Sequence, residues 1–193
     1  MIPANSAAKS HLRQQIRAQL AKISPAVRAV ESIELCERLE PQLRSARRIL
    51  FFAPLPDELD VWPLLEKLLA AGKICALPWY DAEQNAYGAK VVEDLAADIV
   101  PGQFGVREPA AGCAEMPLAE FDLVLVPGLA FDETGHRLGR GQGFYDRILA
   151  AAGGVKCGVA HNFQLLEKVP TEAHDARVNF IFTPARGVRR KES

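Results

Sequence analysis

Apolar residues recur along the start of the chain at the spacing of an amphipathic helix. Between about Asn5 and Ile23, they appear every four residues and so share one helical face. The residues in this series are Leu12, Ile16 and Leu20. Ser24-Pro25 then supplies an N-cap and a first-turn proline, which predicts a second helix. We expect that helix to end near Glu40-Pro41.

Short apolar runs separated by turn residues predict strands in the rest of the chain. The best defined is FDLVLV at 121–126, whose nearly continuous apolar character is typical of a strand buried on both faces. Asp60 is expected to cap a helix that closes at Gly72, and another helix is expected over 144–152. The stretch 81–120 is expected to be mostly loop. The remaining strands are predicted at 48–53, 73–77, 89–92, 155–160 and 178–183.

Strands that alternate with helices imply parallel pairing. The predicted fold is therefore α/β: a single layered domain over residues 1–193, with a mostly parallel open sheet flanked by helices. At 193 residues and 49 % hydrophobic, the chain is long enough for one domain with a real core, and no linker divides it. We expect the basic tail, residues 186–191, to be a frayed, solvated end.

Charge and cysteine content narrow the function classes. A net charge of −1 gives no overall electrostatic reason to expect nucleic-acid or membrane binding. No apolar run is long enough to span a bilayer. The four cysteines are widely spaced and form no CxxC pair, which favours reduced thiols over a zinc site or disulfides. We expect a cytoplasmic monomer. A transit peptide is the alternative, because the first 30 residues are amphipathic and contain no acidic residue.

The most informative stretch is the loop RLGRGQGFYDR at 137–147, directly after the predicted strand 121–126 and its Pro-Gly turn. Its three alternate glycines allow a sharp turn and close approach to a ligand, and the next helix starts with free N–H groups. Arg137 and Arg140 add forked donors for phosphate or carboxylate, and Asp146 is suited to magnesium. The alternative is a surface turn with a capping aspartate. The spacing matches neither GxGxxG nor a P-loop.

The block 126–147 (VPGLAFDETGHRLGRGQGFYDR) closely resembles the signature of 5-formyltetrahydrofolate cyclo-ligases, also called methenyltetrahydrofolate synthetases. Shorter matches follow in the family's order over nearly the whole chain. They are KSHLR at 9–13, PLPDELDVWPL at 54–64, GQFGVREP at 102–109, and His174-Asp175 with Val178, which matches H-D-x-x-V. The resemblance implies an ATP- and Mg²⁺-dependent ligase that closes 5-formyltetrahydrofolate, with or without a polyglutamate tail, into 5,10-methenyltetrahydrofolate. ADP and phosphate are released through an iminium phosphate.

The resemblance also implies roles for particular residues. The catalytic residues it implies are Arg140 and Tyr145, and the magnesium ligands are Asp146 and Asp175. The ATP-binding residues are Lys9, Arg13, Arg137, Leu138, Gly139, Arg140, Gly141, Gln142, Gly143, Phe144 and Tyr145. The folate-binding residues are Ala53, Glu58, Arg140, Gly141, Gln142, Gly143 and Phe144, with Phe51, Phe52 and Trp62 offering either ring contacts or core packing. Each charged residue has a plainer alternative: a solvated basic stripe for Lys9 and Arg13, a helix cap for Asp146, a turn for Asp175 and a loop acid for Glu58.

The sequence departs from the family pattern at the predicted folate pocket. The usual G-Y-Y-D reads GFYD at 143–146, and the segment 85–88 reads NAYG where relatives commonly carry a Met-x-aromatic pair. Phe52 stands where a tyrosine is frequent. Two other functions compete with the ligase: a non-catalytic binding or RNA-associated module of the same fold, and a sugar-phosphate isomerase-like enzyme. The first would have lost the charged residues that this chain keeps.

Overall fold

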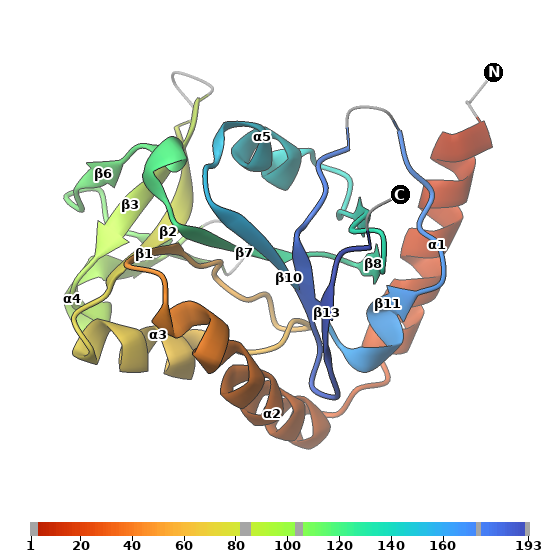
Figure 1. Ribbon diagram of the computed structural model, residues 1–193, viewed down its shortest axis with the longest axis horizontal. Helices are drawn as coiled ribbons and strands as arrows, with labels where there is room; N and C mark the ends of the chain where they lie inside the picture. The colour runs from red at the N-terminus through yellow and green to blue at the C-terminus, as the bar shows by residue number, and fades with distance from the viewer. Residues whose placement is uncertain (1–3, 82–85, 103–105, 173–174, 192–193) are drawn as a thin grey trace.

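The computed structural model describes residues 4–81, 86–102, 106–172 and 175–191. Its centre is an eight-stranded sheet in the order β13-β12-β10-β7-β1-β2-β3-β6 (Figure 1). The five central strands, from β12 to β2, are all parallel, while β13, β3 and β6 add antiparallel edges. The strands of this sheet are β1 (Arg48–Leu50), β2 (Ile74–Asp81), β3 (Ala86–Val92), β6 (Glu115–Met116), β7 (Leu123–Pro127), β10 (Val155–Val159), β12 (Phe180–Phe182) and β13 (Gly187–Arg189). The predicted α/β class with a mostly parallel sheet is confirmed.

Helices cover both faces of the sheet, because alternate side chains of β7 are apolar on both faces and each face must be buried. Leu123 and Leu125 belong to one apolar cluster, together with α2 (Pro25–Arg44) and α3 (Trp62–Ala70). Val124 and Val126 point the other way, into a cluster with α5 (Phe144–Ala151). Every residue of β7 is buried, as its continuous apolar run predicts.

A second, smaller layer carries α1 (Ala4–Leu20), which stands apart from the other helices in Figure 1. Ile16 and Leu20 of α1 pack against Leu129, Ala130 and Leu138. These partners lie in or beside a three-stranded sheet in the order β11-β8-β9. Its strands are β8 (Ala130–Asp132), β9 (Arg137–Leu138) and β11 (Leu165–Leu166). The apolar face of α1 was predicted, but this small sheet was not.

Three other expectations about the elements need correction. The second helix continues past Pro41 to Arg44. Pro41 has no N–H to donate to the Glu37 carbonyl, but both residues are exposed, and the full burial of Leu43 in the core favours the continued helix. The basic tail is not frayed, since β13 pairs with β12 and the Lys191 N–H donates to the Glu133 carbonyl. The stretch expected to be mostly loop contains short elements besides β3 and β6: α4 (Leu95–Asp98), β4 (Ile99–Pro101), β5 (Arg107–Pro109) and a 3₁₀ turn (Leu118–Glu120).

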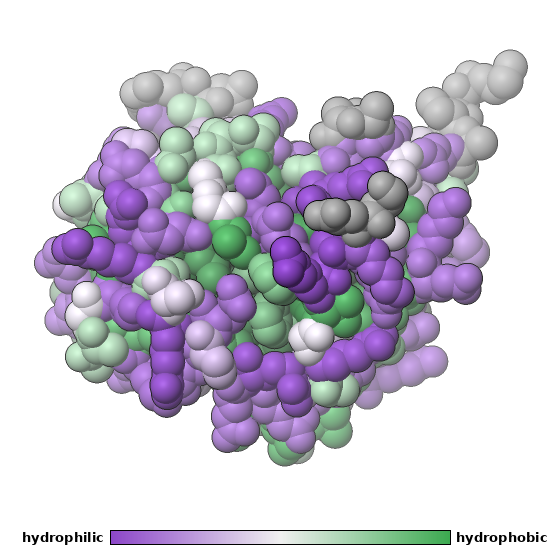
Figure 2. All heavy atoms as spheres, viewed as in Figure 1, coloured by the Kyte–Doolittle hydropathy of each residue, from purple (hydrophilic) through white to green (hydrophobic). Residues whose placement is uncertain are grey.

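The surface in Figure 2 is largely hydrophilic, with apolar side chains gathered in limited areas. One such area lies over α2, where Val27, Val30 and Ile33 are exposed. No helix in the described ranges has the length and apolar character needed to cross a bilayer. All four cysteines are free thiols.

Candidate functional site

A cavity of about 300 Å³ lies where α1 meets the glycine-rich loop that follows β9. It brings together segments from both ends of the chain, as expected at the carboxyl edge of a parallel sheet. Its lining residues are Ser6, Lys9, Arg13, Arg137, Leu138, Gly139, Gly141, Gly143, Asp146, Glu172 and Asp175. The basic residues of α1 therefore face the same space as the glycine-rich loop.

The glycine-rich loop owes its shape to two left-handed residues. Gly141 has φ +106° and Gly143 has φ +69°, conformations that strain any residue with a Cβ atom. Gly143 occupies the cap position of α5 without a side-chain cap. The first N–H groups of α5 therefore start beside the cavity without a capping side chain at that position.

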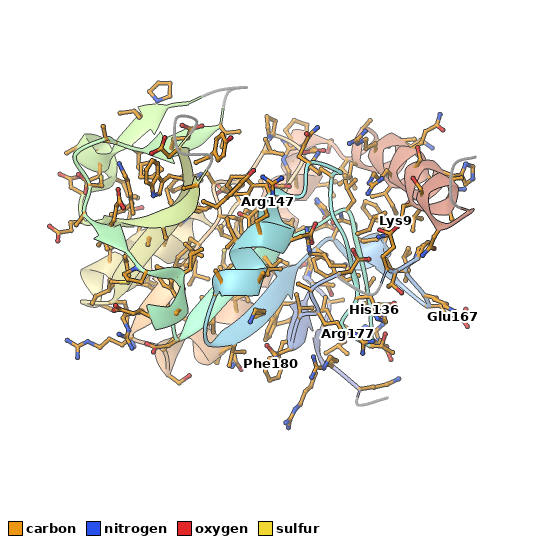
Figure 3. The ribbon with its side chains drawn as sticks, turned by 90° about the horizontal axis from the view of Figure 1, so that it is seen from above. Lys9, His136, Arg147, Glu167, Arg177 and Phe180 are labelled. Atoms are coloured by element: carbon orange, nitrogen blue, oxygen red, sulfur yellow. The ribbon has the colours of Figure 1, made fainter. Side chains whose placement is uncertain are left out.

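Lys9 and Arg13 reach this loop and the segment near Asp175 from one face of α1. The Lys9 Nζ lies 2.7 Å from the Asp175 Oδ2 and 2.8 Å from the Glu172 Oε2. Burial of Lys9 lowers its pKa, but the hydrogen bonds and charges of these two carboxylates outweigh that effect and raise the pKa above its ordinary value. The Arg13 Nε donates to the Gly139 carbonyl at 2.9 Å. Figure 3 shows Lys9 on the side of α1 that faces the rest of the molecule.

Arg137 and Asp146 form an ion pair across the glycine-rich loop. Arg137 is only 6 % exposed, and its guanidinium lies 5.9 Å from the centre of the Tyr145 ring. Its Nε is buried without a hydrogen-bond partner among the described residues. Asp146 remains partly exposed at the cavity wall, so its carboxylate is accessible from the cavity.

Arg140 lies beside two acidic residues from the loop after β1. Its guanidinium contacts the Asp57 Oδ1 at 2.6 Å and the Glu58 Oε1 at 3.1 Å. The other Glu58 oxygen accepts the Leu55 N–H at 3.0 Å. Burial raises the pKa of Glu58 above its ordinary value, against the opposing effects of Arg140 and the Leu55 N–H. This carboxylate is thus fixed in orientation and poorly solvated.

Tyr145 lies between the Arg137–Asp146 pair and the group formed by Arg140, Asp57 and Glu58. Burial raises the pKa of its phenol well above the usual value, and the Glu58 charge acts in the same direction. The hydroxyl therefore keeps its proton at neutral pH. Tyr145 can donate a hydrogen bond or position a ligand, but it is not suited to act as a base.

The family model described as the 5-formyltetrahydrofolate cyclo-ligase family matches residues 5–184 of this chain. The chain belongs to this family. A 5-formyltetrahydrofolate cyclo-ligase of Mycolicibacterium smegmatis is 34 % identical over 187 residues, covering 93 % of this chain and 95 % of the relative. One of Escherichia coli K12 is 33 % identical over 150 residues, covering 76 % and 82 %. The solved structure of Aquifex aeolicus 5,10-methenyltetrahydrofolate synthetase has a TM-score of 0.85 at 32 % identity, covering 96 % of this chain and 94 % of that one.

As a member of the cyclo-ligase family, the protein is an enzyme of the ligase class. The structure brings most of the residues named from the sequence into the cavity or its rim. Leu138 is buried against α1, so only its backbone can meet a ligand. Gln142 is exposed, and Ala53 is half-buried in the loop after β1. His174 and the centre of the GQFGVREP segment, residues 103–105, lie outside the described residues.

Of the three aromatic residues that the sequence left open, two are core residues and the third packs against the core. Phe51 and Phe52 are buried in the cluster beneath α2 and α3. Trp62 packs against the same cluster, with the Arg107 guanidinium 5.2 Å from the centre of its ring. The substitution of tyrosine by Phe52 therefore falls in the core.

Sequence reasoning missed several residues at the site. Ser6 lines the cavity, and its position three residues before Lys9 on the same helical face could have revealed it. Glu172 and Asp57 pair with Lys9 and Arg140, but nothing in their local sequence distinguishes them from ordinary loop acids.

Asp146 and Asp175 both line the cavity, from α5 and from the segment before β12. The described residues contain no group of three or more His, Cys, Asp or Glu side chains arranged to hold a metal ion. Two carboxylates fit magnesium, which keeps waters and takes its other ligands from substrate phosphates. Because Asp146 and Asp175 already pair with Arg137 and Lys9, the site is electrically balanced without a ligand.

Proposed function

We propose that this enzyme uses Mg-ATP to convert 5-formyltetrahydrofolate into 5,10-methenyltetrahydrofolate, releasing ADP and phosphate. The observation that carries the proposal is the meeting of two sets of charged groups at the glycine-rich loop. One set, around Lys9, Arg13, Arg137 and two aspartates, suits a nucleotide triphosphate and its metal. The other, Arg140 with Glu58, adjoins it from the loop after β1. We also propose a cytoplasmic monomer formed by one domain over residues 1–193, and these parts rest on the sequence alone.

The proposed reaction begins by converting the oxygen of the formyl amide into a good leaving group. That oxygen is a poor leaving group, so transfer of the γ-phosphoryl group from ATP to that oxygen creates an iminium phosphate. N10 then attacks the same carbon and loses its proton. The bond between that carbon and the phosphorylated oxygen breaks, phosphate leaves, and the methenyl product is formed. A bound Mg²⁺ held by Asp146, Asp175 and phosphate oxygens would supply charge neutralisation. The enzyme's main tasks are thus alignment and electrostatic stabilisation.

Each of the two sets of charged groups has a task in this series of reaction steps. Lys9 and Arg13 hold the phosphate chain from α1, and the backbone N–H groups at the start of α5 contribute donors. Arg140 lies beside Glu58, the residue proposed to bind the pterin, and so is close to the expected position of the formyl group. There its guanidinium stabilises charge on the phosphoryl group during transfer. Glu58 accepts hydrogen bonds from the donor edge of the pterin, which fixes the folate relative to Arg140. Tyr145 stays protonated and positions the ligands.

The test is a spectrophotometric assay of the purified protein with 5-formyltetrahydrofolate and Mg-ATP, following the near-ultraviolet absorbance of the methenyl product. Growth of that absorbance only when ATP and magnesium are both present supports the proposal. Absence of product in the complete mixture, with the protein folded, would contradict it.

Replacing Arg13 with glutamine is expected to raise the KM for ATP about tenfold, because one charge-assisted contact to phosphate is lost. The KM for the folate should stay the same. Steady-state kinetics with each substrate varied in turn measures this, with Lys22→Gln, an exposed cation just after the same helix, as the matched control. Equal changes in both KM values would show that Arg13 acts through the fold of the loop instead.

Folate binding is expected to weaken as pH falls, and to do so at a higher pH than an ordinary glutamate would cause. Burial raises the pKa of Glu58 above its ordinary value of 4.5. As the pH falls, the Glu58 carboxylate therefore becomes protonated at a higher pH than an ordinary glutamate would. The protonated form accepts fewer hydrogen bonds from the pterin, so the KM for the folate rises. Kinetics across this range checks the effect. Glu58→Gln should give a high KM with no such dependence, and an unchanged pH profile would exclude Glu58 as its source.

A further inference from the structure

A row of aromatic side chains leads from the largely buried Glu58 carboxylate towards solvent. Tyr145 stands at its inner end, where it packs against the core cluster that contains Leu59, the residue next to Glu58. The Tyr145 and Phe144 ring centres are 5.4 Å apart, and those of Phe144 and Tyr87 are 5.1 Å apart. Both pairs meet edge to face. The row therefore joins the start of α5 to the edge strand β3.

Tyr87, which also contacts the exposed Tyr80 ring, carries a cation. The Arg147 Nη1 donates to the Tyr87 hydroxyl at 2.6 Å, and the guanidinium lies 4.9 Å from the centre of that ring. Arg147 is exposed on α5, as Figure 3 shows. No carboxylate of the described residues pairs with it, in contrast to Lys9, Arg137 and Arg140. The remaining N–H groups of its fork are available to an external anion.

We propose that Arg147, held in place by Tyr87, binds a carboxylate of the folate's glutamate tail. The inference rests on the proposed function and extends it to substrate specificity. A folate presents a donor-rich pterin, then a flat benzoyl ring, then an anionic glutamate. The protein presents a carboxylate, then the Phe144 and Tyr87 rings, then a guanidinium, in the same order. Tyr87 contributes twice, since its ring faces the guanidinium and its hydroxyl fixes the fork.

The test compares 5-formyltetrahydrofolate with its diamide, in which both glutamate carboxylates are neutral carboxamides. The wild-type KM should be about fivefold higher for the diamide, the size expected for a solvent-exposed ion pair. Arg147→Gln should raise the KM for the acid to that of the diamide and leave the KM for the diamide unchanged. The turnover number and the KM for ATP should also stay constant. Added salt should weaken binding of the acid to the wild type more than to the variant.

Two variants sharpen the result. Tyr87→Phe keeps the ring but releases the guanidinium, so it should raise the KM for the acid by a smaller factor. Arg189→Gln removes an exposed arginine on β13 and should change neither KM. Equal wild-type KM values for acid and diamide would overturn the inference and leave the proposed function standing. So would an Arg147→Gln effect of equal size on both substrates. Failure of the wild type to turn over either folate would instead refute the proposed function.

Discussion

Replacing Arg140 with alanine is expected to lower the turnover number by about a thousandfold while the protein stays folded. Groups that stabilise a phosphoryl group in transit contribute effects of this size. Arg140 is placed for this task because it extends from the glycine-rich loop to Glu58 and Asp57 after β1, which are 82 and 83 residues away in the sequence. Kinetics at saturating ATP and folate measures the loss.

Stability and a lysine variant separate this role from a structural one. Loss of Arg140 leaves Asp57 and Glu58 close together without their cation, at a cost of about 1–2 kcal/mol because the cluster keeps some solvent contact. Thermal unfolding should therefore show a modest fall in Tm. Arg140→Lys should recover part of the stability but little of the turnover, since an ammonium lacks the planar fork. Near-normal turnover in the alanine variant would remove Arg140 from the mechanism.

The second large effect is expected from Asp146→Asn. This change keeps the shape of the side chain but removes its charge, so magnesium should bind about 10–100-fold more weakly. Turnover at ordinary magnesium concentration should fall steeply and return in part as the concentration is raised. Activity titrated against magnesium measures the shift.

Asp94→Asn is the matched control, because Asp94 also lies at the start of a helix and accepts the Ala96 N–H. If Asp146 served only the helix dipole of α5, its replacement would cost about 0.5 kcal/mol of stability and leave the magnesium requirement unchanged. That result would contradict a metal-binding role. Recovery at high magnesium in Asp146→Asn, with no change in Asp94→Asn, is the outcome expected here.

The elements that the sequence predicted well are those whose signal is local. The apolar run that forms β7 and the four-residue repeat of α1 each determine their own structure. The elements that were missed depend on partners far along the chain. β8 pairs with β11 through Phe131 and Leu165, and β13 is ordered by pairing with β12. The end of α2 was wrong for a similar reason, since burial of Leu43 outweighs the local effect of Pro41.

The candidate site also contains some residues that the local sequence predicts and others that only the fold reveals. The glycine-rich loop and its arginines stand out in the sequence, because few other local patterns combine alternate glycines with forked cations and a helix start. Which acids face those cations could not be predicted from local pattern. Asp57 and Glu172 look like ordinary loop residues until the fold brings them to Arg140 and Lys9. The pairing of Arg147 with Tyr87 joins α5 to β3 and needed the packed structure too.

The most direct measurement of the central claim follows the oxygen of the formyl group. The enzyme would be given Mg-ATP and 5-formyltetrahydrofolate carrying oxygen-18 in its formyl carbonyl, and the released inorganic phosphate would be analysed by mass spectrometry. Phosphoryl transfer to the formyl oxygen predicts one oxygen-18 in each phosphate formed, in step with the methenyl product. Unlabelled phosphate, with the label released into water, would contradict the account.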